Sequence, residues 1–229
     1  MTRPLRARIL SAVALATALF AHDVASQAPV SGAAEVGVRN RYLVAGLPFA
    51  EGAVTHARAH VAGSGFLLGG LAVYDHELGA LGEADIFGEV GAALGSGALV
   101  SAGLAINNFN FVDEWETTAE AYVVVSLIAP LQPSLMVAHD FDIGDGGHAL
   151  LSLRHDVDLG VANVGVSSHL DYSRGYYSNV SGLSFGDVGL DVSIPLGRVT
   201  LIPFVSMQRA IAGELDDQEV FGVSGAIDF

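Results

Sequence analysis

The sequence predicts an all-β fold, a twelve-stranded antiparallel up-and-down transmembrane β-barrel. Three observations predict it: segments that alternate apolar and polar residues, connections that alternate between short and long, and an export signal at the N-terminus. Successive side chains of a strand point to opposite faces, so this alternation gives each strand one apolar face and one small or polar face. A closed sheet with an apolar outer face satisfies its backbone inside a lipid bilayer.

The N-terminus has the pattern of a secretory signal peptide. Three arginines precede an apolar run over residues 9–21, and residues 24–26 (Val-Ala-Ser) are suited to cleavage. The run is too short to cross a bilayer as a helix, which argues against a retained helical anchor, and no later stretch is long and apolar enough for one. We expect residues 1–26 to be a cleaved signal peptide, 27–34 a short periplasmic segment and 35–229 an outer-membrane β-barrel.

Period-2 alternation recurs through the rest of the chain. The predicted strands are 35–44, 55–61, 65–74, 85–92, 98–109, 116–125, 134–142, 151–158, 163–172, 187–194, 199–211 and 218–229. Most approach the length of about 9 to 11 residues that a tilted strand needs to cross a bilayer. The number is even, as expected for a single-chain barrel with both termini on one side.

The connections between these strands alternate in length. Short breaks occur at 62–65, 95–97, 130–133, 159–161 and 195–198, and longer ones at 45–53, 75–83, 110–115, 143–147, 173–182 and 212–217. Outer-membrane barrels have short periplasmic turns and longer extracellular loops. A secreted β-sandwich also alternates, but its strands are shorter and its outer faces are more polar.

The last strand ends the chain on an aromatic residue. Its apolar parity holds Phe221, Val223, Ile227 and Phe229, with small or polar residues between them. This pattern resembles the terminal-strand signal that the barrel-insertion machinery of bacteria reads. We therefore predict that these four residues form the assembly signal, and that outer-membrane lipid, periplasmic chaperones and the barrel-assembly machinery are partners.

Composition excludes several classes of function. The chain has no Cys, so disulfides and thiolate sites cannot form, and its formal net charge of −15 argues against nucleic acid as a partner. No cofactor and no metal site are predicted. Asp140, Asp142 and Asp145 have nearly the spacing of a calcium loop, but the register is wrong and Asp-Gly turn chemistry explains them better.

The polar face is expected to line the lumen, and acids dominate it. The predicted lumen-lining residues are Glu35, Arg39, Arg41, Arg58, Asp85, Glu89, Glu116, Glu120, Arg154, Asp156, Asp158, Asp171, Asp187 and Asp191. Small inward residues such as Gly103 and Gly189 favour free volume in the lumen. A packed lumen, in which arginines and acids pair across the barrel, is the alternative.

Ser167, His169 and Asp171 share one face of one predicted strand and invite comparison with a Ser-His-Asp hydrolase. Same-face neighbours along a strand lie roughly 6.5–7 Å apart, which is too far for direct contact between Ser and His. We therefore expect no enzyme activity, although outer-membrane phospholipase A is also a twelve-stranded barrel.

Two short stretches resemble the TorF-type porin family of bacterial outer-membrane barrels. The first is R-N-R-Y-L-V-A-G-L-P-F over residues 39–49, and the second is A-G-S-G-F-L-L-G over residues 62–69. The positions that match the family are Arg41, Tyr42, Gly46, Ser64, Gly65 and Phe66. The chain departs from the family at Gly63 and Leu71, where a polar residue and an aromatic are usual. The resemblance implies an outer-membrane barrel and pore formation.

We expect a porin-like channel in the outer membrane of a Gram-negative bacterium. It would pass small hydrophilic solutes by passive diffusion and prefer cations, because carboxylates lower the energy of an entering cation. The alternative is a closed barrel that serves as an interaction or adhesion scaffold, with Phe49, Tyr176 and Tyr177 as candidate exposed aromatics in its loops.

Overall fold

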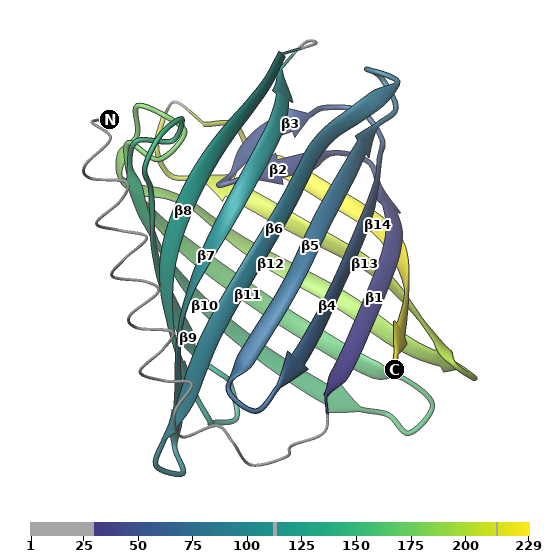
Figure 1. Cartoon of the computed structure of the whole chain (residues 1–229). Helices are drawn as coiled ribbons and strands as arrows, with labels where there is room; N and C mark the ends of the chain where they lie inside the picture. The colour runs from purple at the N-terminus through teal and green to yellow at the C-terminus, as the bar shows by residue number, and fades with distance from the viewer. Residues whose placement is uncertain (1–29, 112–113, 214) are drawn as a thin grey trace.

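The structure, a computed structural model, describes residues 30–111, 114–213 and 215–229. These described residues form a closed barrel of twelve antiparallel strands and one separate two-stranded sheet (Figure 1). The barrel strands are β1 (Ser31–Arg39), β4 (Val54–Gly63), β5 (Phe66–Asp75), β6 (Ala80–Leu94), β7 (Ala98–Phe111), β8 (Glu114–Leu127), β9 (Ser134–Asp140), β10 (Gly147–Asp158), β11 (Asn163–Arg174), β12 (Ser181–Leu196), β13 (Val199–Ala210) and β14 (Gln218–Asp228). The predicted fold class is confirmed.

The first strand differs from its prediction at both ends. β1 begins at Ser31 rather than at residue 35, and it ends at Arg39 rather than at residue 44. Residues after Arg39 keep the alternating pattern but belong to a separate hairpin of β2 (Tyr42–Val44) and β3 (Leu47–Ala50). The predicted signal peptide, residues 1–26, lies outside the described residues.

Pairing of the first strand with the last closes the barrel. β1 pairs with β14, where Ala33 faces Asp228, and with β4, where Glu35 faces Arg58. The seam extends to the last residue, because Gly32 and Phe229 exchange two backbone hydrogen bonds of 2.7 and 2.9 Å. The strand edges at the seam are therefore paired, as a bilayer requires.

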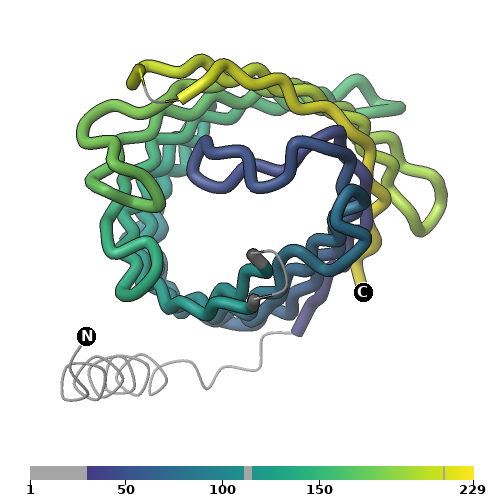
Figure 2. The backbone as a smooth tube through the Cα atoms, turned by 90° about the horizontal axis from the view of Figure 1, so that it is seen from above, coloured from purple at the N-terminus to yellow at the C-terminus, as the bar shows by residue number. Residues whose placement is uncertain are grey.

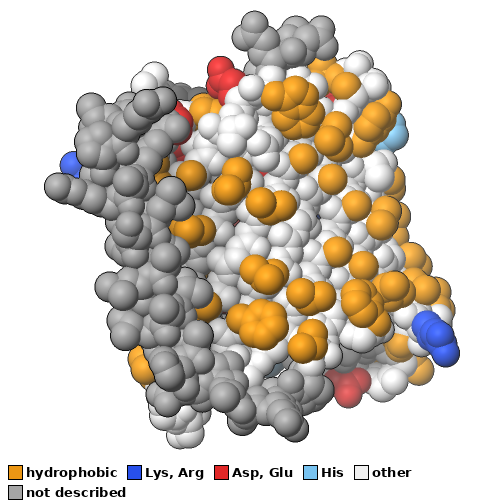
Figure 3. Space-filling view, in the orientation of Figure 1, with side chains coloured by type: hydrophobic (Ala, Val, Ile, Leu, Met, Phe, Trp, Pro, Cys, Tyr) orange, Lys and Arg blue, Asp and Glu red, His pale blue; other side chains and the backbone are white. Residues whose placement is uncertain are grey.

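The outer wall of the barrel is apolar. Outward side chains such as Val36, Ile86 and Val188 are 58%, 61% and 58% exposed. The face seen in Figure 3 carries hydrophobic side chains along most of its height, and the charged ones lie toward its margins. Outward aromatics include Trp115 and Tyr172 near one end and Phe66 near the other, which resembles the aromatic girdles of membrane barrels. Within the described residues, no helix is long and apolar enough to cross a membrane.

The two ends of the barrel differ. The turn end holds the connections at 64–65, 95–97, 128–133, 159–162 and 197–198, together with the start of β1 and the C-terminus (Figure 1). Gly65 and Gly197 adopt φ of 77° and 70° there, which favours glycine over residues that carry a Cβ. The loop end holds the loops 40–53, 76–79, 141–146, 175–180 and 211–217. The predicted alternation of short turns and longer loops holds only in part. The connection between β5 and β6 is shorter than the predicted 75–83, the predicted loop 110–115 is mostly strand, and the turn-end connection 128–133 is longer than predicted.

The β2–β3 hairpin folds into the barrel instead of extending away from it. Viewed along the barrel axis, it lies inside the ring of strands (Figure 2). Its base packs on a small buried cluster of Ala50, Val54 and Val73, which Tyr42 and Leu71 flank. The loop end of the lumen is therefore partly filled by the chain itself.

Candidate functional site: the lumen of the barrel

The hairpin lies in the lumen and is anchored on β13, which is two strands away from β1 in the barrel. The Gly46 carbonyl accepts a hydrogen bond of 2.9 Å from the Gln208 Nε2 of β13. A Cβ at Gly46 would lie 2.5 Å from the Phe185 ring, so this glycine permits the close approach. The Arg39 guanidinium lies 5.6 Å from the ring centres of both Tyr42 and Phe204, and so links the hairpin to β13.

A second loop enters the lumen from the β11–β12 side. The Tyr176 hydroxyl donates a hydrogen bond to Glu120, and the Tyr177 hydroxyl donates one of 2.9 Å to Asp140. Tyr176 also stacks on the His148 ring, with 4.3 Å between the ring centres. Burial, followed by the neighbouring carboxylates, raises the pKa of both tyrosines, so the two phenols remain neutral donors.

The hairpin and this loop meet in an aromatic cluster. The Phe49 ring lies 4.9 Å from the Phe109 ring and 6.3 Å from the Tyr177 ring, centre to centre, and Tyr176 packs edge-on against Tyr177 at 4.6 Å. We call Phe49, Phe109, Tyr176 and Tyr177 the loop-end cluster. The expectation that Phe49, Tyr176 and Tyr177 are exposed is wrong: Tyr176 is only 6% exposed, because these side chains turn inward to pack on one another.

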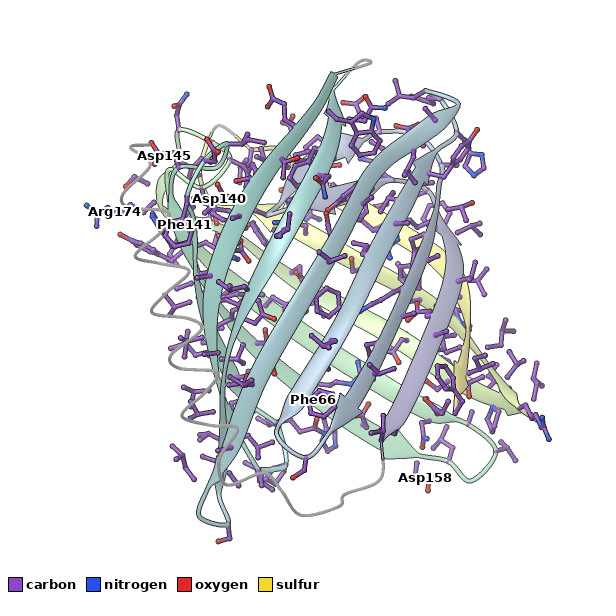
Figure 4. All side chains as sticks on the ribbon, viewed as in Figure 1. Phe66, Asp140, Phe141, Asp145, Asp158 and Arg174 are labelled. Atoms are coloured by element: carbon purple, nitrogen blue, oxygen red, sulfur yellow. The ribbon has the colours of Figure 1, made fainter. Side chains whose placement is uncertain are left out.

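Asp140 fixes the loop 141–146 and joins it to the loop-end cluster. Its carboxylate accepts hydrogen bonds from the Thr118 hydroxyl at 2.7 Å and from the backbone N–H groups of Asp142 and Gly144 at 2.9 Å. Asp140 and Asp145 lie at the loop end (Figure 4). The aspartate-rich segment thus uses its first carboxylate to cap its own turn.

The turn-end half of the lumen is hollow. A cavity of about 670 Å³ is lined there by Leu99, Ser126, Leu127, Ile128, Ala129, Gln132, Ser134, Ser152, Leu153, Arg154, Ser167 and His169. A second cavity of about 450 Å³ lies beside it and shares Leu99 and Ser126. The lumen therefore widens from a packed loop end to an open turn end.

Several predicted lumen charges are paired along the wall. Arg154 binds Asp191 at 2.8 Å and Asp156 at 2.7 Å. His169 binds Asp187 at 2.7 Å, His148 binds Asp171 at 2.9 Å, and His56 binds Glu35 at 3.3 Å. Glu120 is held by Tyr176, and Asp85 accepts the N–H of Asn108 at 3.2 Å. Most of these partners lie on neighbouring strands or in loops, but Asp156 shares β10 with Arg154, and Asp191 is reached across β11 on β12.

Other predicted lumen charges have no ion pair among the described residues. Arg58 is exposed inside the barrel, 5.4 Å from the centre of the Phe87 ring, and Glu89 hydrogen-bonds the Tyr122 hydroxyl. Glu116 is exposed near the loop end, and Asp158 lies at the turn end (Figure 4), where it accepts the N–H of Gly160. Arg41 lies in the loop before β2, where it donates a hydrogen bond to Gln218.

The glycines that suggested free volume are filled by larger neighbours, so that expectation is wrong. A Cβ at Gly103 would lie 2.3 Å from the Tyr122 ring, and one at Gly189 would lie 2.7 Å from the Ser167 hydroxyl. Both glycines make room for a side chain of an adjacent strand. The free volume lies instead at the turn end.

Ser167, His169 and Asp171 do not act on one another. His169 binds Asp187 on β12, whereas Asp171 binds His148 on β10 and the Ser184 hydroxyl on β12. The histidine that a serine nucleophile would need is thus oriented by a different strand. This arrangement lacks the hydrogen-bonded chain of a Ser-His-Asp triad.

Sequence reasoning missed Glu83, which it left in a loop. Glu83 is 5% exposed in β6 and hydrogen-bonds both Asp85 and the Tyr42 hydroxyl of the hairpin. Burial, followed by Glu83, raises the pKa of Tyr42. Its position two residues before Asp85, on the same strand parity, is the signal that could have identified it.

No family model and no curated protein sequence matches this chain. Its solved structural neighbours include outer-membrane channels. The KdgM porin superposes with a TM-score of 0.57 at 11% identity, over 87% of this chain and 99% of the porin. The same porin in complex with disordered oligogalacturonate gives 0.54 at 10% identity, with the same coverage. The COG4313 outer membrane channel from Pseudomonas putida F1 gives 0.52 at 10% identity, over 91% of this chain and 98% of that one. The chain thus has the fold of outer-membrane β-barrel channels.

Proposed function

We propose that the protein is an outer-membrane porin-like channel that passes small hydrophilic solutes by passive diffusion and prefers cations. The apolar outer wall, the polar lumen and the likeness in fold to known channels support this proposal. In it, residues 1–26 are a cleaved signal peptide, the turn end faces the periplasm and the protein is related to TorF-type porins. Periplasmic chaperones and the barrel-assembly machinery deliver it to the membrane.

The excess of carboxylates over guanidinium groups on the lumen face supports the cation preference. Among the described residues, Arg39, Arg58 and Arg154 are the arginines of the lumen wall, and Arg154 is already neutralised by two aspartates. Glu89 and Glu116 have no such ion pair. A confined lumen strengthens the field of uncompensated charge, which stabilises an entering cation and repels an anion.

The charges are also separated around the barrel. Arg39 and Arg58 lie on β1 and β4, whereas Glu89 and Glu116 lie on β6 and β8. The resulting field crosses the lumen, so a dipolar solute is oriented as it passes. Such a field suits small polar molecules better than long polyanions.

The known complex of the KdgM porin does not transfer to this chain. Oligogalacturonate is a chain of acidic sugars, and an acidic lumen repels it. We therefore infer that the two proteins share a fold and differ in the charge of the solute that they favour.

Planar-bilayer recording in a potassium chloride gradient tests this function. We expect a reversal potential shifted toward the potassium equilibrium potential, with a smaller shift at high salt, because salt screens the carboxylates. Glu116→Gln should reduce the shift. Glu219→Gln, which removes the same charge from an outward position at the same end, should leave it unchanged. A chloride-selective wild-type channel would refute the cation preference.

A closed barrel that serves as a scaffold remains the second candidate, and the packing of the loop end favours it. The loop-end cluster and the buried Asp140 and Glu120 narrow the lumen there. Protein that is shown to be folded by its circular dichroism but gives no conductance in any condition would support this scaffold and contradict the channel.

A further inference from the structure

A row of polar side chains crosses the lumen wall at the turn-end cavity. Strand register aligns Ser126 of β8 with Ser134 of β9, Ser134 with Ser152 of β10, and Ser152 with His169 of β11. Adjacent strands lie about 4.8 Å apart, so the row offers a polar group at that interval. Ser167 lies beside this row, and all five side chains line the 670 Å³ cavity.

The serine hydroxyls of this row are available to a ligand. Among the described residues, the side chains of Ser126, Ser134, Ser152 and Ser167 form no hydrogen bond with another protein group, whereas most polar groups deeper in the barrel do. Each hydroxyl can donate one hydrogen bond and accept two. The cavity volume lies within the range of about 300–1,000 Å³ that is usual for small-molecule sites.

The basic side chains of the cavity already have carboxylate partners. Arg154 donates to both oxygens of Asp191 at 2.8 and 3.1 Å, and it also binds Asp156. His169 is held by Asp187 at 2.7 Å. Among the described residues, the cavity therefore presents hydroxyl groups and no free cationic group, because the carboxylates around it outnumber the guanidinium group.

A glycine keeps the arginine against the wall. A Cβ at Gly165 would lie 2.2 Å from the Arg154 Nη2 and 2.7 Å from the Asp191 Oδ1. Without a side chain at position 165, the guanidinium lies flat across β11 to reach β12. The space above the serine row thus stays open.

We propose that the turn-end cavity is a binding site for an uncharged, polyhydroxylated solute, a sugar or polyol. Ligand hydroxyls can exchange donors and acceptors with the serine row, and Leu99 and Ile128 offer apolar contact to the carbon skeleton. An anionic ligand would lose hydration without gaining a free counter-charge. The proposal rests on the channel function and names the class of solute that the channel holds in transit.

Equilibrium titration of the purified barrel tests the site, in micelles of a detergent that contains no sugar. The probes are galactose and galacturonate, and binding is measured from the shifts of protein NMR signals. We expect galactose to bind with millimolar affinity and galacturonate to bind at least fivefold more weakly. Tighter binding of galacturonate than of galactose would overturn the proposal. It would also be overturned if galactose did not bind up to about 100 mM, a hundredfold above the ~1 mM of a weak complex.

Variants connect the binding to the serine row. Ser134→Ala and Ser152→Ala should each weaken galactose binding about fivefold, the effect of one net hydrogen bond. Ser168→Ala, on the outward parity of the same wall, should have no effect. Gly165→Ala should lift Arg154 from the wall and so raise galacturonate affinity relative to galactose. Unchanged galactose affinity in both serine-row variants would also overturn the site.

This titration is independent of the channel. A barrel that conducts no ions but binds galactose through the serine row would refute the proposed function and retain the site. A conducting barrel that binds no galactose would refute the binding site and retain the proposed channel function.

Discussion

Replacing Phe49 should release the hairpin from the lumen. Phe49→Ala removes the ring contacts with Phe109 at 4.9 Å and with Tyr177 at 6.3 Å. Each aromatic pair contributes about 0.5–1.5 kcal/mol beyond the area it buries. Loss of both pairs therefore weakens the anchoring of the hairpin by about 1–3 kcal/mol, which raises the population of the displaced hairpin about 5- to 150-fold.

Single-channel recording measures this population directly. We expect the variant to spend more time in a higher-conductance state, because the displaced hairpin no longer narrows the loop end. Phe66→Ala is the matched control, since Phe66 is an outward aromatic at the turn end (Figure 4). Conductance and dwell times identical to those of the wild type in Phe49→Ala would refute the idea that the hairpin restricts the lumen.

Three further predictions concern assembly, pH and catalysis. Deleting Phe229 should lower the yield of heat-modifiable barrel on SDS gels, because the backbone of Phe229 closes the seam with Gly32. Asp228→Ala should leave this yield unchanged. Equal yields for the two variants would count against the role of the terminal residue. Burial raises the pKa of Tyr176 and Tyr177 above the ordinary value of about 10. Their contribution to stability is therefore complete below about pH 10 and decreases as the pH rises further. Conductance should increase above about pH 10 as the loop end loosens, and a flat profile of conductance against pH would contradict this. Ser167→Ala should leave purified protein as unable to hydrolyse phospholipid vesicles as the wild type, and serine-dependent hydrolysis would contradict the channel interpretation.

The barrel was predictable because its main signal is local. Alternation with a period of two residues sets which side chains point outward, and the same rule applies to every strand. The exposed Val188 and the inward Asp187 show this rule in neighbouring residues of β12. Lipid outside and a polar lumen inside are enough to fix the faces of the strands.

The hairpin was not predictable from the same signal. Tyr42 and Val44 continue the alternation of β1, so the local pattern gives no reason to end the strand at Arg39. Contacts that are distant in the sequence decide its position, such as that of Gly46 with Gln208, which are 162 residues apart in the chain. Local sequence patterns therefore cannot predict such contacts.

Parity placed the charged residues on one face but could not assign their partners. Arg154 binds Asp191 because β11 places Gly165 between them, and this depends on strand register and on a missing side chain. The same limit applies to Gly103, whose space is taken by Tyr122. Whether a small residue leaves a void depends on what the neighbouring strand places there.

The seam between β1 and β14 determines when this protein can fold. Ala33 pairs with Asp228, so the first strand of the barrel has no partner on one side until the final strand has been synthesised. Until then the sheet has open edges and a large apolar surface, the combination that leads to aggregation. The barrel therefore cannot close while the chain is still being made. The placement of the two termini thus makes assembly a single late event, whose rate depends on contacts between the most distant parts of the sequence.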